Sequence, residues 1–147
     1  MRIYQPVRFR GAEGEVIEEA LIDTGASISL IPRKLAIKIG AWHTNQTINI
    51  VGIHRQSRVL PLGVVRVYFP SLNNIGGHFT VAVSDNEKEP IIGMDILRSL
   101  GISIDTTTSR LQVKNEIWEA FKTLSAFTVG GFLIIKALDA IFKEKEE

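Results

Sequence analysis

The chain has 147 residues, 45% of them hydrophobic, which is the size and apolar content of one globular domain. Lys and Arg number 17 and Asp and Glu 16, so the net charge of +1 provides no broad field, and we expect no nucleic-acid partner. Cysteine is absent and the three histidines are scattered, so disulfides and thiolate chemistry are excluded and we expect no metal or cofactor.

The first half of the chain is expected to form short strands separated by turns. Strands are predicted at residues 3–10, 15–22, 48–53 and 59–69. The first two flank the turn Gly11–Gly14, and the last two flank a polar tip at 52–57. Between these hairpins a short helix is predicted to begin at Pro32, which suits a first helical position, and to end at Gly40.

The second half continues the same pattern up to about residue 114. A loop is expected at 70–77, a strand at 78–83, a helix at 94–100 that ends at Gly101, and a hairpin of 102–105 with 111–114. Many short strands with few helices predict an all-β barrel or sandwich over residues 1–114.

One stretch has the composition of a catalytic loop. The apolar strand end Ala20-Leu21-Ile22 is followed by Asp23, Thr24 and Gly25. A carboxylate at such a place lies in a partly dry site, where burial disfavours its charged form. The glycine permits close backbone approach and the hydroxyl can bond to a neighbouring loop. Asp-Thr-Gly is also an ordinary turn after a strand, so the tripeptide alone does not establish catalysis.

A second motif, later in the chain, supports the catalytic interpretation of the first. Pro90-Ile91-Ile92-Gly93-Met94-Asp95-Ile96-Leu97 is an apolar pair, a glycine and a helix start. Asp-Thr-Gly, then a flap-like hairpin, then this motif is the order of retropepsin-type aspartic proteases. The chain resembles that family over residues 1–114, and it resembles the cellular and prokaryotic members more than the viral ones.

The resemblance implies a role for each matching residue. Asp23 would be the catalytic aspartate, Thr24 the residue that locks the two active-site loops across a dimer, and Gly25 the glycine whose carbonyl meets substrate. Ile91, Ile92 and Gly93 would pass behind the catalytic loop, and Gly52–Gln56 would be the flap tip. Substrate contact is expected from Gly25, Ala26, Ser27, Gly52, Ile53, His54, Arg55 and Ile92.

Several of these residues have a second interpretation. Ile28, Leu30, Ile53 and Ile92 fit apolar subsites, but burial for packing explains them equally well. His54 and Arg55 are also typical of solvated turn residues. Viral members carry an acid and an arginine where this chain has Ser27 and Met94, so the viral mode of contact with the substrate backbone does not transfer.

The implied reaction is peptide hydrolysis by a water activated between two carboxylates that share a proton. The chain contains a single Asp-Thr-Gly, so the second carboxylate must come from another copy, as in a twofold homodimer. The sequence therefore predicts an aspartic endopeptidase acting on a peptide or protein. The rival hypothesis is a non-catalytic module of the same fold that dimerises and binds peptides, tethered to a membrane or free.

Residues 115–147 are expected to form a hydrophobic or amphipathic helix and a charged tail. Residues 117–142 are rich in apolar side chains, but the uncharged run 123–135 is shorter than the ~20 residues that a spanning helix needs. Three interpretations remain open: a membrane anchor, a helix packed on the protease body or its dimer mate, and a partner-binding helix. No signal peptide is visible, so the protein is expected to be cytoplasmic or membrane-associated through this helix.

Overall fold

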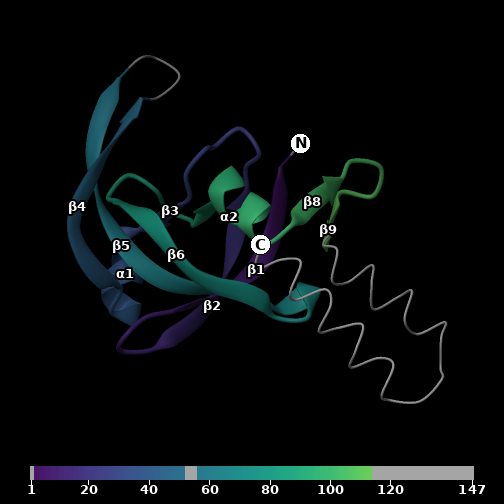
Figure 1. The fold of residues 1–147 in the computed structure, drawn as a ribbon, viewed down its shortest axis with the longest axis horizontal. Coiled ribbons are helices and arrows are strands. Elements are labelled where there is room, and N and C mark those ends of the chain that lie inside the picture. Colours follow the sequence, from purple (N-terminus) through teal and green to yellow (C-terminus); the bar gives the residue numbers. More distant parts are fainter. Residues whose placement is uncertain (1, 52–55, 114–147) are drawn as a thin grey trace, which may run out of the picture. The chain divides into compact units, whose positions relative to one another are not determined.

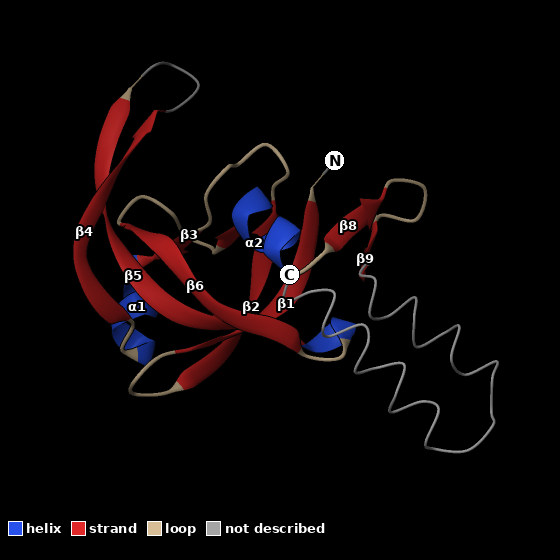
Figure 2. Cartoon of the chain, in the orientation of Figure 1, coloured by secondary structure: helices blue, strands red, loops and turns tan. Residues whose placement is uncertain are grey.

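A computed structural model describes residues 2–51 and 56–113 of the chain (Figure 1). Residues up to Gln112 form one compact unit, and the remainder of the chain forms a second unit. The described part is mainly β with short helices (Figure 2), as the sequence predicts. The predicted C-terminal helix and tail, residues 115–147, lie outside the described residues.

Seven strands of the described part form one sheet, in the order β1-β2-β7-β3-β6-β5-β4. The strands are β1 (Ile3–Arg10), β2 (Glu15–Ile22), β3 (Leu30–Pro32), β4 (Trp42–Val51), β5 (Ser57–Phe69), β6 (Ile75–Ser84) and β7 (Ile91–Ile92). Because β1 also pairs with β5, six of these strands close into a ring, and β4 is attached to the outside of β5. The closed ring is the predicted barrel.

The remaining elements are short. They are α1 (Arg33–Ile39), the 3₁₀ turn η1 (Pro70–Leu72), α2 (Met94–Ser99), and the two-stranded sheet of β8 (Ile102–Asp105) and β9 (Arg110–Val113). In the turn between β8 and β9, the hydroxyl and the N–H of Thr107 donate to the Asp105 carboxylate. These two hydrogen bonds lower the pKa of Asp105, because they favour its charged form.

The core explains why the first strands are where the sequence predicts them. Phe9, Val65, Val67 and Phe69 are fully buried and alternate with half-buried or exposed residues along β1 and β5. Burying each such side chain contributes about 1.5–3 kcal/mol, so a one-residue shift of either strand is strongly disfavoured. This core holds the neighbouring strand β2, and therefore the residues that follow β2, in a fixed place.

Several predicted boundaries are wrong. β3 was not predicted, β4 begins six residues before the predicted start at 48, and β6 begins at Ile75 within the predicted loop 70–77. Residues 43–47 of β4 are all polar and mostly exposed, so this part of the strand lacks the apolar alternation by which a strand is recognised. Gly76 was placed in the loop because glycine is typical of loops, but it belongs to β6. A glycine is required there because a Cβ would clash with the Val67 carbonyl oxygen of β5. α1 begins one residue after Pro32 and ends, as predicted, at Gly40, whose φ is 67°.

Candidate active site

Asp23 lies at the end of β2, where two strands far apart in the sequence run side by side. Leu21 and Ile22 pair in parallel with Ile91 and Ile92 of β7. The N–H of Asp23 then donates to the Ile92 carbonyl oxygen at 2.9 Å. The two motifs of the sequence are therefore in direct contact, and the core-forming strands fix the point at which Asp23 leaves the sheet.

A backbone N–H orients the Asp23 carboxylate. Oδ1 of Asp23 accepts the N–H of Gly25 at 2.9 Å. A Cβ at Gly25 would lie 3.2 Å from the same oxygen, so glycine is the residue that leaves this carboxylate the most room. Asp23 is half-buried, and no other hydrogen bond to its carboxylate is formed within the described ranges. One oxygen is thus held and the other is free to meet a second group.

A buried serine ties the loop after Asp23 to the start of α2. Ser29 is fully buried, and its Oγ donates to Asp95 Oδ1 at 2.6 Å and accepts the N–H of Gly93 at 2.8 Å. The N–H of Ser29 donates to the other Asp95 oxygen at 3.1 Å. Close by, the N–H of Met94 donates to the Ala26 carbonyl at 2.8 Å. These bonds restrict the whole segment between Asp23 and β3.

The link between Ser29 and Asp95 was not predicted from the sequence. The prediction for this region was only that Ser27 and Met94 stand where the viral proteases carry a charged pair. The signal in the sequence was that Ser29 stands between the apolar residues Ile28 and Leu30, directly before the apolar strand β3. A buried hydroxyl needs a hydrogen-bond partner, and Gly93 and Asp95 at the start of α2 supply it.

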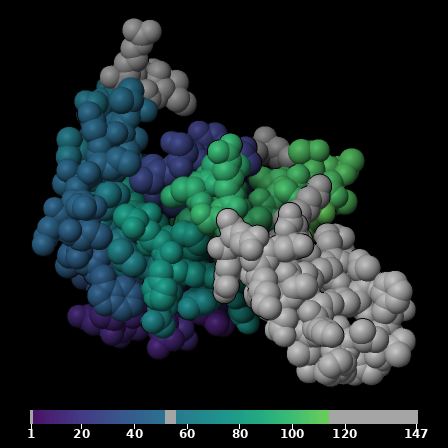
Figure 3. All heavy atoms as spheres, in the orientation of Figure 1, coloured from purple at the N-terminus to yellow at the C-terminus, as the bar shows by residue number. Residues whose placement is uncertain are grey.

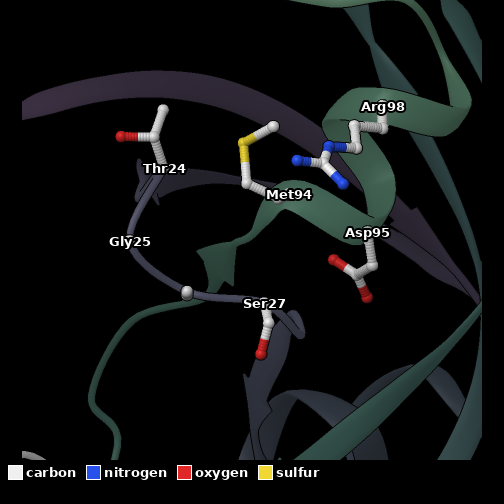
Figure 4. Close-up of a pocket in the computed structure, with 7 residues that line it drawn as sticks. Thr24, Gly25, Ser27, Met94, Asp95 and Arg98 are labelled. Atoms are coloured by element: carbon white, nitrogen blue, oxygen red, sulfur yellow. The ribbon is translucent and has the colours of Figure 1, made fainter.

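The loop and α2 enclose a small open cavity of about 350 Å³ (Figure 4). Its lining residues are Thr24, Gly25, Ala26, Ser27, Met94, Asp95 and Arg98. In the space-filling view the loop after β2 reaches the surface between the β4–β5 hairpin and α2 (Figure 3). The structure thus brings together Thr24, Gly25, Ala26 and Ser27, four of the predicted site residues, beside Asp23.

Ile92, which the sequence assigned to substrate contact, has a different position. Its side chain is 0% exposed, so it packs in the core and does not line an accessible surface. Leu30 is 8% exposed and belongs to a buried cluster with Leu60 and Ala82. For both residues the packing interpretation holds, and the pairing of β2 with β7 is what places Ile92 beside Ile22 in the core.

The β4–β5 hairpin presents an apolar face to the same region. Half-buried side chains pack against the cluster of Leu30, Leu60 and Ala82; they are Ile28, Ile48, Ile50, Leu62 and Ile91. Ile28 and Leu30 come from the segment that follows Asp23, so the hairpin lies against this segment. The predicted tip residues Gly52, Ile53, His54 and Arg55 lie outside the described residues.

The described residues contain no group of three or more His, Cys, Asp or Glu side chains placed to hold a metal ion. Among them, no helix has the length and apolar character needed to cross a bilayer.

We expect Asp95→Asn to destabilise the fold by about 1–3 kcal/mol and to lower any activity of the site. The amide keeps one oxygen for Ser29 Oγ–H, but its NH₂ then faces the N–H of Ser29, so two donors meet where a donor met an acceptor. Urea unfolding measures the loss. Ser99→Ala, which removes an exposed hydroxyl on the same helix, serves as the control and should stay within about 0.5 kcal/mol of the unmodified chain. Equal stability of both variants would mean that the Ser29–Asp95 link is unimportant.

Comparison with known proteins identifies the architecture. The structure is similar to the crystal structure of the retroviral protease-like domain of Ddi1 from Leishmania major, with a TM-score of 0.54 and 21% sequence identity over 78% of this chain and 89% of that one. It is also similar to EIAV protease complexed with the inhibitor HBY-793, with a TM-score of 0.51 and 18% identity over 71% of this chain and 93% of that one. No model of a protein family matches the sequence, and no curated protein matches it. At these identities the likeness concerns the fold, which is retropepsin-like, as the sequence motifs predicted.

Proposed function

We propose that this chain of retropepsin-like fold is an aspartic endopeptidase whose active site forms when two copies bring their Asp23 side chains together. The observation that carries the proposal is the placement of Asp23. It follows β2 directly, the Gly25 N–H holds one carboxylate oxygen at 2.9 Å, and the other oxygen is free of hydrogen bonds within the described part. A carboxylate held in this way, half-buried beside an apolar hairpin face, is prepared to meet an identical group across a twofold axis.

Two such carboxylates at close range cannot both be ionised, so the pair carries one proton. The ionised member takes a proton from a water molecule, and the water oxygen attacks the carbonyl carbon of the scissile peptide bond. The protonated member donates to the carbonyl oxygen. When the tetrahedral intermediate breaks down, the C–N bond cleaves and the leaving nitrogen receives a proton from the pair. The two groups titrate together, so the apparent pKa values belong to the dimer.

The other residues near Asp23 would position loop and substrate. Thr24 is exposed at the rim of the cavity, where its hydroxyl can reach the matching loop of a second copy. Gly25 and Ser27 are exposed, so the Gly25 carbonyl and the Ser27 backbone can bond to an extended peptide, whereas the N–H and the carbonyl of Ala26 bond to Asp23 and Met94. The half-buried apolar face of the β4–β5 hairpin would cover that peptide from the other side. Substrate contacts of Gly52, Ile53, His54 and Arg55 remain predictions.

Because a complete site needs two chains, we expect the specific activity on a peptide library to fall when the protein is diluted below its dimer dissociation constant. Activity per chain should track the fraction of dimer measured by mass. A pepstatin-like mimic of the tetrahedral intermediate should inhibit the reaction and shift the mass distribution toward the dimer. Hydrolysis by a species that is monomeric at every concentration would contradict the proposal. A dimer that binds peptides without cleaving them would assign the chain to the non-catalytic alternative.

Attachment to a membrane through residues 117–142 is a separate part of the proposal. Its support is the apolar composition of that segment, and the alternatives of a packed helix or a partner-binding helix stay open. A cytoplasmic or membrane-associated location follows only if this part holds.

A further inference from the structure

The outer face of the sheet carries a row of basic side chains across three neighbouring strands. In antiparallel strands, directly opposed residues share a face. Arg10 of β1 is opposite Arg66 of β5, and Arg66 is opposite His78 of β6. Arg8 lies in the next row, opposite Tyr68. All of these side chains are half-buried or exposed, so they form one surface, which we call the basic face: Arg8, Arg10, Arg66 and His78.

No arginine of the basic face forms an ion pair within the described ranges, although Glu15 and Glu19 of β2 share this face. The ion pairs found there join Arg33 to Asp85 and Arg58 to Glu87, and neither includes a member of the basic face. Glu15 is opposite Arg10 on β2 but forms no ion pair with it. Like charges directly opposite each other on a sheet are unfavourable, so the fold gains nothing from setting Arg10 against Arg66. A ligand that supplies negative charge would remove this repulsion.

Two contacts order side chains of the basic face. Nε of Arg66 donates to Nε2 of His78 at 2.7 Å, which orients the guanidinium toward β6. The Tyr68 ring lies against Gly76, where an added Cβ would come within 2.5 Å of the ring carbon Cδ1. The arginines of the basic face lie on paired strands and not on loops.

Large apolar side chains are interleaved with these cations. Ile17 of β2 is opposite Arg8 and is 53% exposed. Trp42 of β4 is 39% exposed and is opposite Val64, which shares its face with Arg66 two residues along β5. Exposed apolar side chains among cations are unfavourable in water alone. They are favourable at the boundary between lipid headgroups and acyl chains, where Trp and Tyr are enriched.

We propose that the basic face binds the surface of an anionic phospholipid bilayer. The arginines would contact the headgroup phosphates, and Ile17 and Trp42 would enter the boundary below them. A nucleic acid fits less well, because the aliphatic Ile17 cannot stack on a base. No member of the basic face lines the cavity beside Asp23, so the proposal does not depend on hydrolysis.

The test uses the full chain and two kinds of vesicle, phosphatidylcholine alone and phosphatidylcholine with a third phosphatidylserine. The C-terminal segment can bind both kinds, so the quantity that reports the basic face is the ratio of the two partition coefficients. Each arginine near an anionic surface strengthens binding about five-fold, so Arg10→Gln with Arg66→Gln should lower that ratio roughly 25-fold. Binding to phosphatidylcholine alone, and the circular dichroism spectrum, should stay unchanged.

The matched control is Lys34→Gln with Lys38→Gln, which makes the same change of charge at two exposed positions of α1. It should leave the ratio within about two-fold of the unmodified chain, since these lysines lie outside the basic face. A ratio near one for the unmodified chain would overturn the proposal, and so would an equal drop in both variants. Arginine-dependent binding of a single-stranded RNA without any lipid preference would also overturn it and assign the surface to nucleic acid.

Discussion

Replacing Asp23 with asparagine should abolish peptide hydrolysis and leave the folded dimer in place. An amide neither ionises to activate water nor donates an acidic proton, so both halves of the proposed acid–base pair are lost. Each general acid or base contributes roughly 10²–10⁴-fold, so the activity should fall by at least that factor. Asparagine still offers Oδ1 to the Gly25 N–H, which is why the loop should keep its shape. Digestion of a peptide library, read by mass spectrometry, measures the loss.

Two controls separate catalysis from folding. Asp85→Asn removes a carboxylate whose ion pair with Arg33 is exposed on both sides, so activity and stability should hardly change. Mixing unmodified chains with an equal amount of Asp23→Asn chains should leave about one quarter of the dimers with two carboxylates, because subunits of a twofold dimer pair at random. Activity of half the unmodified level after complete exchange would show that each chain cleaves alone. Full activity of the variant by itself would refute the role of Asp23.

Gly93→Ala should cause the largest loss of stability among single methyl additions near the site. A Cβ at this position would lie 2.7 Å from the Ala26 carbonyl oxygen and 2.9 Å from that of Ile28, and both atoms belong to the backbone. The loop after Asp23 would have to move, which breaks the Gly93 N–H bond to Ser29 Oγ. We expect a cost of about 1–3 kcal/mol or more in urea unfolding. Activity should fall about 10²-fold, since a shift of 1 Å in a catalytic group has that effect.

The matched control is Gly14→Ala in the turn between β1 and β2. No atom lies within 4 Å of a Cβ built at Gly14, so the free energy of unfolding should change by less than about 0.5 kcal/mol. If Gly93→Ala unfolded at the same urea concentration as Gly14→Ala, the close contact of Gly93 with the backbone of Ala26 and Ile28 would not constrain the residue at this position.

Local signals made part of the fold predictable. The hairpin of β1 and β2 has apolar alternation on both strands and a glycine at each end of its turn, so its bounds follow from neighbouring residues alone. Pro32 and Gly40 mark α1 in the same way. β3 has three residues and pairs with residues of β6 and β7 that come 50 or more positions later, so no local pattern predicts it.

The residues of the candidate site show the same difference between local and distant signals. Asp23, Thr24 and Gly25 are adjacent in the sequence and could be recognised as a motif. The bond between Ser29 and Asp95 joins residues 66 positions apart, and neither has an unusual neighbourhood. Ile92 was assigned to substrate contact as an apolar residue of the family motif. Its burial, however, depends on its pairing with the distant strand β2. Predictions from the sequence failed where distant segments decide the environment.

The parallel pairing of β2 with β7 sets the order in which the loop after β2 can gain its support during synthesis. β2 leaves the ribosome well before residues 91 and 92, which form the strand that supports its end. Closing so long a loop is slow compared with forming the hairpin of β1 and β2. A growing chain therefore carries Asp23 on an unsupported loop until most of the domain has been made.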